Sequence, residues 1–193
     1  MPSYFKRLLH RLQHKQPKKP VYAPYPCNIP VYSQRIQMAP PHDDTPSLDK
    51  RGTTWVQSIM CSLLYWSRTL DPTYFPALNE LSGQQAAPTA TTAHRSDHLL
   101  DYVATYPNTI LRYYASDMVL YVESDAAYLI IPNAKSRIAG YFYLSNHPPP
   151  KPTQPTPKRN GPLHVVCKTQ KHVVASAAEA ETAGLFYNVQ EAI

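Results

Sequence analysis

The sequence predicts an α+β protein, because a segment with helical periodicity is followed by short apolar runs and one last helix. Between residues 55 and 66, apolar side chains recur with the period of an amphipathic helix. Beyond Thr109 this period gives way to apolar runs bounded by turn-forming residues, which is typical of strands. Residues 177–192 are rich in alanine and glutamate, both strong helix formers. We expect three parts, which are a basic, proline-rich arm (1–50), a helical segment (51–107) and a strand-rich domain (108–193).

Positive charge is concentrated in the arm. Of the 19 basic residues, seven precede Asp43 and no acid does, whereas the other 12 are balanced by all 13 acids. Residues 4–12 place apolar and basic side chains at helical spacing, which predicts a short amphipathic helix. The prolines between residues 16 and 46 exclude a helix there and predict an extended linker.

A basic amphipathic helix has several interpretations. It could be a mitochondrial presequence, a membrane-surface helix, a nucleic-acid contact, or a helix that packs on its own protein with its basic face in solvent. In the nucleic-acid interpretation, the basic side chains of the arm neutralise phosphates. Those side chains are Lys6, Arg7, Arg11, Lys15, Lys18 and Lys19.

The second segment is expected to contain three helices. The first includes Trp55 and ends near Asp71, because the following proline disfavours the helical conformation of the residue before it. The second covers residues 74–85 and the third residues 91–106. These helices are expected to pack together, and they carry no recognisable catalytic pattern.

The third segment is expected to have the order β-β-β-α. The predicted strands are residues 118–122, 141–144 and 163–167, and the predicted helix is 177–192. A long proline-rich loop before the third strand carries Lys151, Lys158 and Arg159. Ser176 is the predicted N-cap of the helix, and Glu179 stands at the capping-box position.

Two carboxylates on separate elements are what a metal-dependent phosphodiester hydrolase requires. Asp125 follows the first predicted strand and Glu181 lies near the start of the last helix, so each offers oxygen ligands to a hard cation such as Mg²⁺. Each also has an ordinary interpretation, Asp125 as a strand-end acid and Glu181 as a surface glutamate. Glu123 shares a strand face with Asp125 and is expected to be an exposed acid, while Glu179 is about 200° from Glu181 around the helix.

Several other classes of function have no support in the sequence. The cysteines at 27, 61 and 167 form no C-x-x-C pair, which favours a reducing compartment, cytoplasmic or nuclear, over a disulfide framework or a zinc site. No run approaches the ~18 apolar residues of a membrane span. His10 and His14 lie one helical turn apart without a third ligand, and no phosphate-loop or nucleophile-elbow motif occurs.

Several short stretches follow the order of motifs in a known family. The stretches are residues 61–72, 87–89, 99–102, 124–126, 136–141, 168–171 and 176–181. They resemble the motifs G-x-L-x-Y-x-x-x-T-R-P-D, P-T, L-x-Y-L, S-D-A, S-T-x-G-Y, K-x-Q and S-S-x-E-A-E of copia-type retrotransposon Pol polyproteins, where the reverse transcriptase meets the ribonuclease H domain. Two departures stand out, because Cys61 replaces the family's glycine and Leu70-Asp71-Pro72 scrambles R-P-D.

The resemblance implies a reverse-transcriptase connection segment followed by a truncated ribonuclease H-like half-domain. Asp125 and Glu181 would then be two of the acids that hold Mg²⁺ in the complete domain, with the third ligand expected beyond Ile193. The implied ancestral activity is hydrolysis of RNA in RNA–DNA hybrids, and we expect the isolated chain to be inactive. The implied partners are nucleic acid and the remainder of the Pol polyprotein, without a membrane. The alternative is a non-catalytic nucleic-acid-binding or structural module derived from a retrotransposon.

Overall fold

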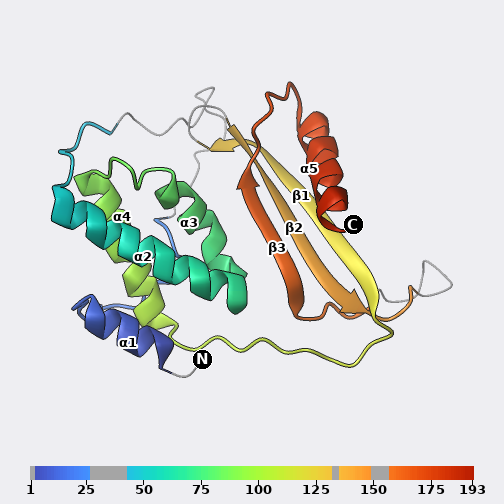
Figure 1. Cartoon of the computed structure of the whole chain (residues 1–193), viewed down its shortest axis with the longest axis horizontal. Coiled ribbons are helices and arrows are strands. Elements are labelled where there is room, and N and C mark those ends of the chain that lie inside the picture. Colours follow the sequence, from blue (N-terminus) through green and yellow to red (C-terminus); the bar gives the residue numbers. More distant parts are fainter. Residues whose placement is uncertain (1–2, 27–42, 132–134, 149–156) are drawn as a thin grey trace. The chain divides into compact units, whose positions relative to one another are not determined.

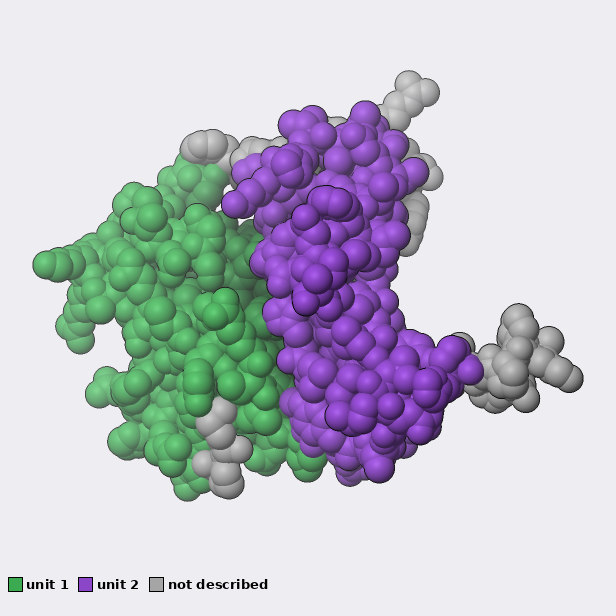
Figure 2. Space-filling model, turned by 45° about the vertical axis from the view of Figure 1, so that its right-hand side comes forward, with its two compact units in different colours: residues 1–110 green, residues 111–193 purple. Residues whose placement is uncertain are grey.

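The computed structural model describes residues 3–26, 43–131, 135–148 and 157–193. The chain divides into two compact units, unit 1 (residues 1–110) and unit 2 (residues 111–193), which Figure 2 shows in different colours. Unit 1 is helical, and unit 2 consists of an antiparallel sheet and one helix (Figure 1). The protein is therefore mixed α+β, as the sequence predicts.

Unit 1 contains four α-helices and one short 3-10 helix within its described residues. They are α1 (Tyr4–Arg11), α2 (Lys50–Thr69), η1 (Pro72–Tyr74), α3 (Phe75–Ser82) and α4 (Ala90–Thr105). Helix α2 begins before the apolar period does, because the side chain of Asp49 caps it by accepting a 2.7 Å hydrogen bond from the amide of Gly52. The second predicted helix is shorter than expected and splits into η1 and α3, since the chain tightens into turns after Ser82.

The start of α4 is held by a residue far away in the sequence. The Asp43 carboxylate accepts hydrogen bonds from the hydroxyl groups of Thr45, Thr89 and Thr91. The bonds from Thr45 and then Thr89 hold the pKa of Asp43 well below its usual range. Thr89 is also the N-cap of α4, so the Asp43 carboxylate holds the segment that contains Asp43 against the start of α4.

The aromatic core of unit 1 includes the arm. Phe5 of α1 is 1% exposed, and its ring centroid lies 4.1 Å from that of Trp66 and 6.0 Å from that of Tyr74. Leu8, one turn later, is buried in the same cluster, while the hydroxyl of Tyr4 donates to the carbonyl of Ser62 on α2. Of the interpretations of the basic helix, the structure therefore shows packing on its own protein.

The residues after α1 are hydrogen-bonded to α4 of the same unit. The side chain of His14 lies 2.8 Å from Asp101 on α4, the amide of Val21 donates to the hydroxyl of Thr105, and His98 is hydrogen-bonded to the carbonyl of Ala23. The first part of the predicted linker contains no helix, in agreement with its prolines, but it contains bends and runs along α4. Residues 27–42 of that linker lie outside the described part of the chain.

Unit 2 has the predicted order of three strands and a helix. The elements are β1 (Val119–Ile131), β2 (Lys135–Ser145), β3 (Pro162–Thr169) and α5 (Ala177–Glu191), with the strands antiparallel in the order β1-β2-β3. Strand β1 is longer than predicted and continues through Asp125, which pairs with Ala139. Asp125 is thus a mid-strand residue and not a strand-end acid. The strand continues because its alternate residues, Ser124 and Ala126, face the covering helix.

Helix α5 packs on the sheet through small and polar residues (Figure 1). Ala180, Gly184 and Asn188 form its buried stripe at a spacing of four residues. The amide of Asn188, which is fully buried, donates 2.8 Å hydrogen bonds to the hydroxyl of Ser124 and to the carbonyl of Ala139. Its oxygen lies against Gly140, so close that a β-carbon at position 140 would clash with it.

The capping of α5 differs slightly from the prediction. Ser176 is the N-cap, as predicted, because its hydroxyl accepts a hydrogen bond from the amide of Glu179. The Glu179 carboxylate accepts from the amide of Ala175 and not from that of Ser176. The Glu179 side chain is therefore hydrogen-bonded to the backbone just before the start of α5.

We predict that Phe5→Ala lowers the free energy of unfolding of unit 1 by about 3–5 kcal/mol, because a fully buried ring is removed and a cavity remains. Both tryptophans, Trp55 and Trp66, belong to unit 1, so urea unfolding followed by tryptophan fluorescence reports on this unit alone. The exposed Lys6→Ala on the same helix is the control. Equal midpoints for both variants would show that α1 does not stabilise the unit.

We also predict that Gly140→Ala lowers the stability of unit 2 by about 1–3 kcal/mol, since the added methyl group overpacks the contact with Asn188. Gly184→Ala on the same interface is the matched control, because its β-carbon would lie 3.4 Å from Ile138 in ordinary contact. Alanine also favours a helix over glycine. Thermal unfolding followed by circular dichroism compares the two, and a Gly140→Ala protein as stable as Gly184→Ala would contradict the described packing.

Candidate functional site

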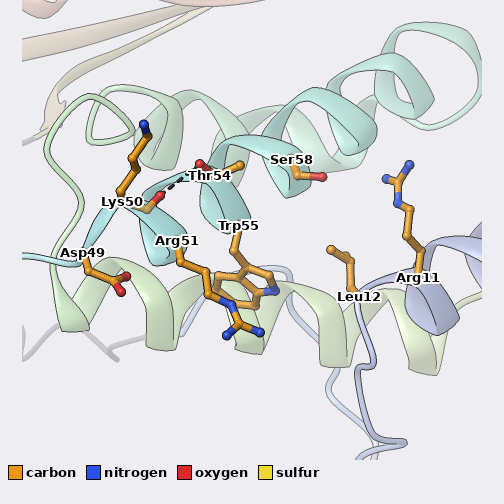
Figure 3. A pocket seen from close by; sticks show the side chains of 8 residues that line it. All are labelled: Arg11, Leu12, Asp49, Lys50, Arg51, Thr54, Trp55 and Ser58. Carbon is orange, nitrogen blue, oxygen red and sulfur yellow. Dashed lines mark hydrogen bonds between the residues drawn. The ribbon is translucent and has the colours of Figure 1, made fainter.

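A basic groove lies between the end of α1 and the first turns of α2 (Figure 3). It is shallow and has a volume of about 700 Å³. The residues that line it are Arg11, Leu12, Asp49, Lys50, Arg51, Thr54, Trp55 and Ser58. Three cationic side chains against one carboxylate give the groove a net positive charge.

Trp55 forms the floor of this groove. Its ring packs with one side against the core of unit 1, as Leu12 does from the other wall, and both remain half-buried. Arg51 precedes Trp55 by one helical turn, so the two side chains share a face of α2. An apolar ring beside a guanidinium group is an arrangement that suits both the base and the phosphate of a nucleotide.

Arg11 reaches the groove from α1 and is fixed there. One of its guanidinium nitrogens donates a 2.8 Å hydrogen bond to the hydroxyl of Ser62 on α2, while the arginine side chain stays exposed. The five-donor fork of an arginine retains free donors after one such bond. The packing of Phe5 and Leu8 thus positions a cation beside a helix that begins some forty residues later in the sequence.

The other basic residues predicted for the arm are exposed and lie outside the groove. Lys6 and Arg7 project from the solvent face of α1, and Lys15, Lys18 and Lys19 lie on the extended segment that follows it. Of the six predicted residues, Arg11 alone lines the groove. The other five are exposed cations that do not line it.

Lys50 and Arg51 were not among the residues predicted to bind nucleic acid. The sequence contains a signal for a binding site at these residues, because two cations directly follow the N-cap Asp49 and Trp55 lies one helical turn after Arg51. Their significance depends on α1 docking next to them, which is a tertiary contact. The predicted division after residue 50 separates Arg51 from Arg11 and makes Lys50 the last residue of the arm.

Acidic groups balance part of this surface. Asp49 caps α2 within the groove, and the nitrogens of His14 lie 3.7 Å from Asp97 and 2.8 Å from Asp101. Burial raises the pKa of Asp97 above its usual value, and the neighbouring Asp101 raises it further, against the opposing effect of His14. The histidine is thus engaged with carboxylates of α4, and it does not pair with His10 to offer a metal site.

Asp125 and Glu181 lie on elements that pack together, but their side chains do not share a face of the sheet. Ser124 and Ala126 both face α5, the first bonded to Asn188 and the second beside Gly184. Because side chains alternate along a strand, Asp125 projects from the opposite face, where it is exposed. Glu181 is exposed on α5 itself.

The neighbours of Asp125 are not metal ligands. Glu123, on the same face, accepts a 3.0 Å hydrogen bond from the hydroxyl of Tyr143 and forms an ion pair with Arg159. In the described part of the chain, no three or more histidine, cysteine, aspartate or glutamate side chains gather as a metal site would require. The two predicted carboxylates therefore do not fit a shared Mg²⁺ ion in this arrangement.

Across residues 3–26, 43–131, 135–148 and 157–193, none of the helices has both the length and the apolar character needed to cross a membrane. Comparison with protein-family models, with curated proteins and with solved structures found no match to this chain. The resemblance to retrotransposon Pol polyproteins thus remains an expectation drawn from short motifs.

Proposed function

We propose that this protein binds nucleic acid without cleaving it, and that the groove of unit 1 is the main contact. The observation that carries the proposal is that Arg11 of α1 lines the same groove as Lys50 and Arg51 of α2, with the Arg51 side chain beside the ring of Trp55 (Figure 3). Cations that neutralise phosphates release condensed counterions, which supplies most of the affinity of sequence-independent binding. Lys6, Arg7, Lys15, Lys18 and Lys19 extend the positive field around the groove.

The chemistry of the groove favours a phosphodiester chain over an isolated small anion. Its volume of about 700 Å³ is spread over an open surface, so a compact ligand would stay solvated. The carboxylate of Asp49 already accepts a hydrogen bond from the amide of Gly52 in the first turn of α2, and its negative charge disfavours a compact anion at this helix start. A polyanion can bridge Arg11 and Arg51 while it avoids Asp49.

We predict that the triple variant Arg11→Gln, Lys50→Gln and Arg51→Gln binds a fluorescein-labelled duplex at least about tenfold more weakly at moderate salt. The plot of log affinity against log salt concentration should become shallower by about 0.9 for each phosphate that the variant no longer neutralises. Fluorescence anisotropy at several salt concentrations measures both quantities.

The control for that experiment neutralises three exposed cations outside the groove, Arg68→Gln, Lys135→Gln and Lys171→Gln, and so changes the net charge equally. If the control loses as much affinity as the groove variant, binding follows the total charge and the groove has no special part. If neither variant loses affinity, the groove does not contact nucleic acid.

A second candidate is that unit 2 is half of a ribonuclease H-like domain from a copia-type retrotransposon Pol polyprotein. The specific observation in its favour is the element order, three antiparallel strands followed by a helix that packs on β1. In this proposal the ancestral substrate is an RNA–DNA hybrid, the cofactor of the complete domain is Mg²⁺, and the partner is the remainder of the polyprotein. Asp125 and Glu181 would be the ancestral ligands.

We predict no hydrolysis of a labelled RNA–DNA hybrid by the purified chain with Mg²⁺. The reason is that Asp125 projects from the face of the sheet opposite to α5, whereas Glu181 is exposed on α5 itself, so these two carboxylates do not hold one cation between them. Denaturing electrophoresis of the products over time is the measurement. Cleavage that disappears in Asp125→Asn would show that a working site assembles and would overturn the non-catalytic proposal.

A further inference from the structure

Unit 2 presents two neighbouring tyrosines to solvent just before β1. Tyr113 is 58% exposed and Tyr114 is 45% exposed, although neither lies in a helix or strand. Single exposed apolar residues are common on protein surfaces, whereas neighbouring exposed aromatic rings are a candidate interaction site. These two rings are held in place.

The backbone of this segment is fixed by a buried side chain. Asn160, only 8% exposed, accepts a 2.8 Å hydrogen bond from the amide of Tyr114 and donates a 2.9 Å bond to the carbonyl of the same residue. The oxygen of Asn160 also accepts from the amide of Gly161. A side-chain amide thus replaces the pairing that a strand would give, and it anchors Tyr114 and the residue before it.

The ring of Tyr113 lies flat on Gly161. A β-carbon at position 161 would be 2.8 Å, 2.9 Å and 2.9 Å from three adjacent carbons of that ring. Nearly equal distances to three neighbouring ring atoms place the glycine beneath the face of the ring and not at its edge. The hydroxyl of Tyr113 donates a 3.0 Å bond to the carbonyl of Pro162, which fixes the ring direction. One face of the ring is covered, and the exposed part is turned to solvent.

Cations surround the tyrosine pair. The ammonium group of Lys158 lies 3.5 Å from the ring centroid of Tyr114, at cation–π distance. Hydrogen bonding to Lys158, with a smaller contribution from Arg112, lowers the pKa of the Tyr114 hydroxyl below its usual value. Arg112 directly precedes the tyrosine pair in the sequence and is exposed. Arg159 follows Lys158, stays 62% exposed, and shares its charge with Glu123. Lys151, on the same loop, lies outside the described residues.

We propose that this tyrosine platform, formed by Arg112, Tyr113, Tyr114, Lys158 and Gly161, binds unpaired nucleotides of single-stranded nucleic acid. The ring of Tyr113 stacks on a base, while Lys158 and Arg112 neutralise the adjoining phosphates. The inference deepens the proposed nucleic-acid function by naming the class of nucleic acid, but it uses residues of the other unit.

Two physical reasons favour an unpaired strand over other anionic partners. In a duplex the faces of the bases are stacked on each other, so a flat ring can stack only on a base that is free. An acidic peptide or an anionic lipid surface would use the cations but would leave the rigid ring face without a partner. Preorganisation by Asn160 and Gly161 means that stacking orders no flexible side chain, which is where affinity is usually lost.

The test uses the full chain with the groove neutralised by Arg11→Gln, Lys50→Gln and Arg51→Gln. In that background, anisotropy measures the affinity for fluorescein-labelled oligothymidine and for a duplex of equal length. We expect Tyr113→Leu to weaken oligothymidine binding by about 5- to 100-fold, the range typical of removing one base–aromatic stack, and to leave duplex binding unchanged. Tyr113→Phe keeps the ring and should bind nearly as the parent does.

Two further variants separate the platform from a general loss of structure. Gly161→Ala adds a methyl group beneath the Tyr113 ring and should weaken oligothymidine binding without any change of charge. Tyr22→Leu removes an even more exposed tyrosine from unit 1 and should change nothing. Thermal unfolding by circular dichroism identifies any variant that fails to fold, and Tyr113→Phe then serves as the folded reference.

The outcomes distinguish this proposal from that of the groove. If Tyr113→Leu binds oligothymidine as the parent does, or loses single-stranded and duplex binding equally, the platform is wrong whatever the groove does. If groove neutralisation leaves duplex affinity intact while Tyr113→Leu loses oligothymidine, the proposed groove fails and the platform stands. Abolition of all oligothymidine binding by groove neutralisation alone would overturn the platform and support the groove.

Discussion

The contact between Phe5 and Trp66 determines where the positive charge of this protein lies. Seven of the 19 basic residues precede Asp43, and as a free arm they would form a diffuse cloud of charge. Burial of the Phe5 ring, with Leu8 beside it, fixes α1 on α2. The basic side chains of α1 therefore start from defined positions on the surface of unit 1. Arg11 then lines the same groove as Arg51 and Trp55, although the two arginines are far apart in the sequence. The hydrophobic packing of α1 on α2 thereby brings Arg11 to the basic groove.

The second unit follows the same logic with polar contacts. Asn188 enters the interface between α5 and the sheet because Gly140 leaves room for its amide, and its two hydrogen bonds set the register of the helix on the strands. That register turns Ser124 and Ala126 inward, and it consequently turns Asp125 outward. The small residues of the interface therefore govern the position of the acid that the sequence singles out.

Features that depend on neighbouring residues in the sequence were predictable. The period of α2, the cap at Ser176 and the β-β-β-α order all follow from local patterns, and the structure has each of them. The length of β1 was underestimated, because Asp125 resembles a strand end until its neighbours are seen to pack on α5. Residues 16–46 are predicted to be an extended linker. The contacts of Val21 and Ala23 with α4, like that of His14 before them, were not predictable because they join residues more than seventy positions apart. The groove and the tyrosine platform escape prediction for the same reason, since Arg11 with Arg51 and Tyr113 with Gly161 are pairs made by the fold.

The outward position of Asp125 has a consequence for self-association. Among the described strands, β1 lies at the edge of the sheet, where the unpaired amide and carbonyl groups of an edge strand can form hydrogen bonds with a strand of another molecule. If two copies paired through antiparallel β1 strands centred on Asp125, the two aspartates would face each other. A shift of centre by one residue, to Ser124, would set each Asp125 against the Glu123 of the other copy. Like charges directly opposite each other destabilise such a pair. Asp125 at the middle of this edge strand therefore disfavours both of these registers of pairing between two copies of β1.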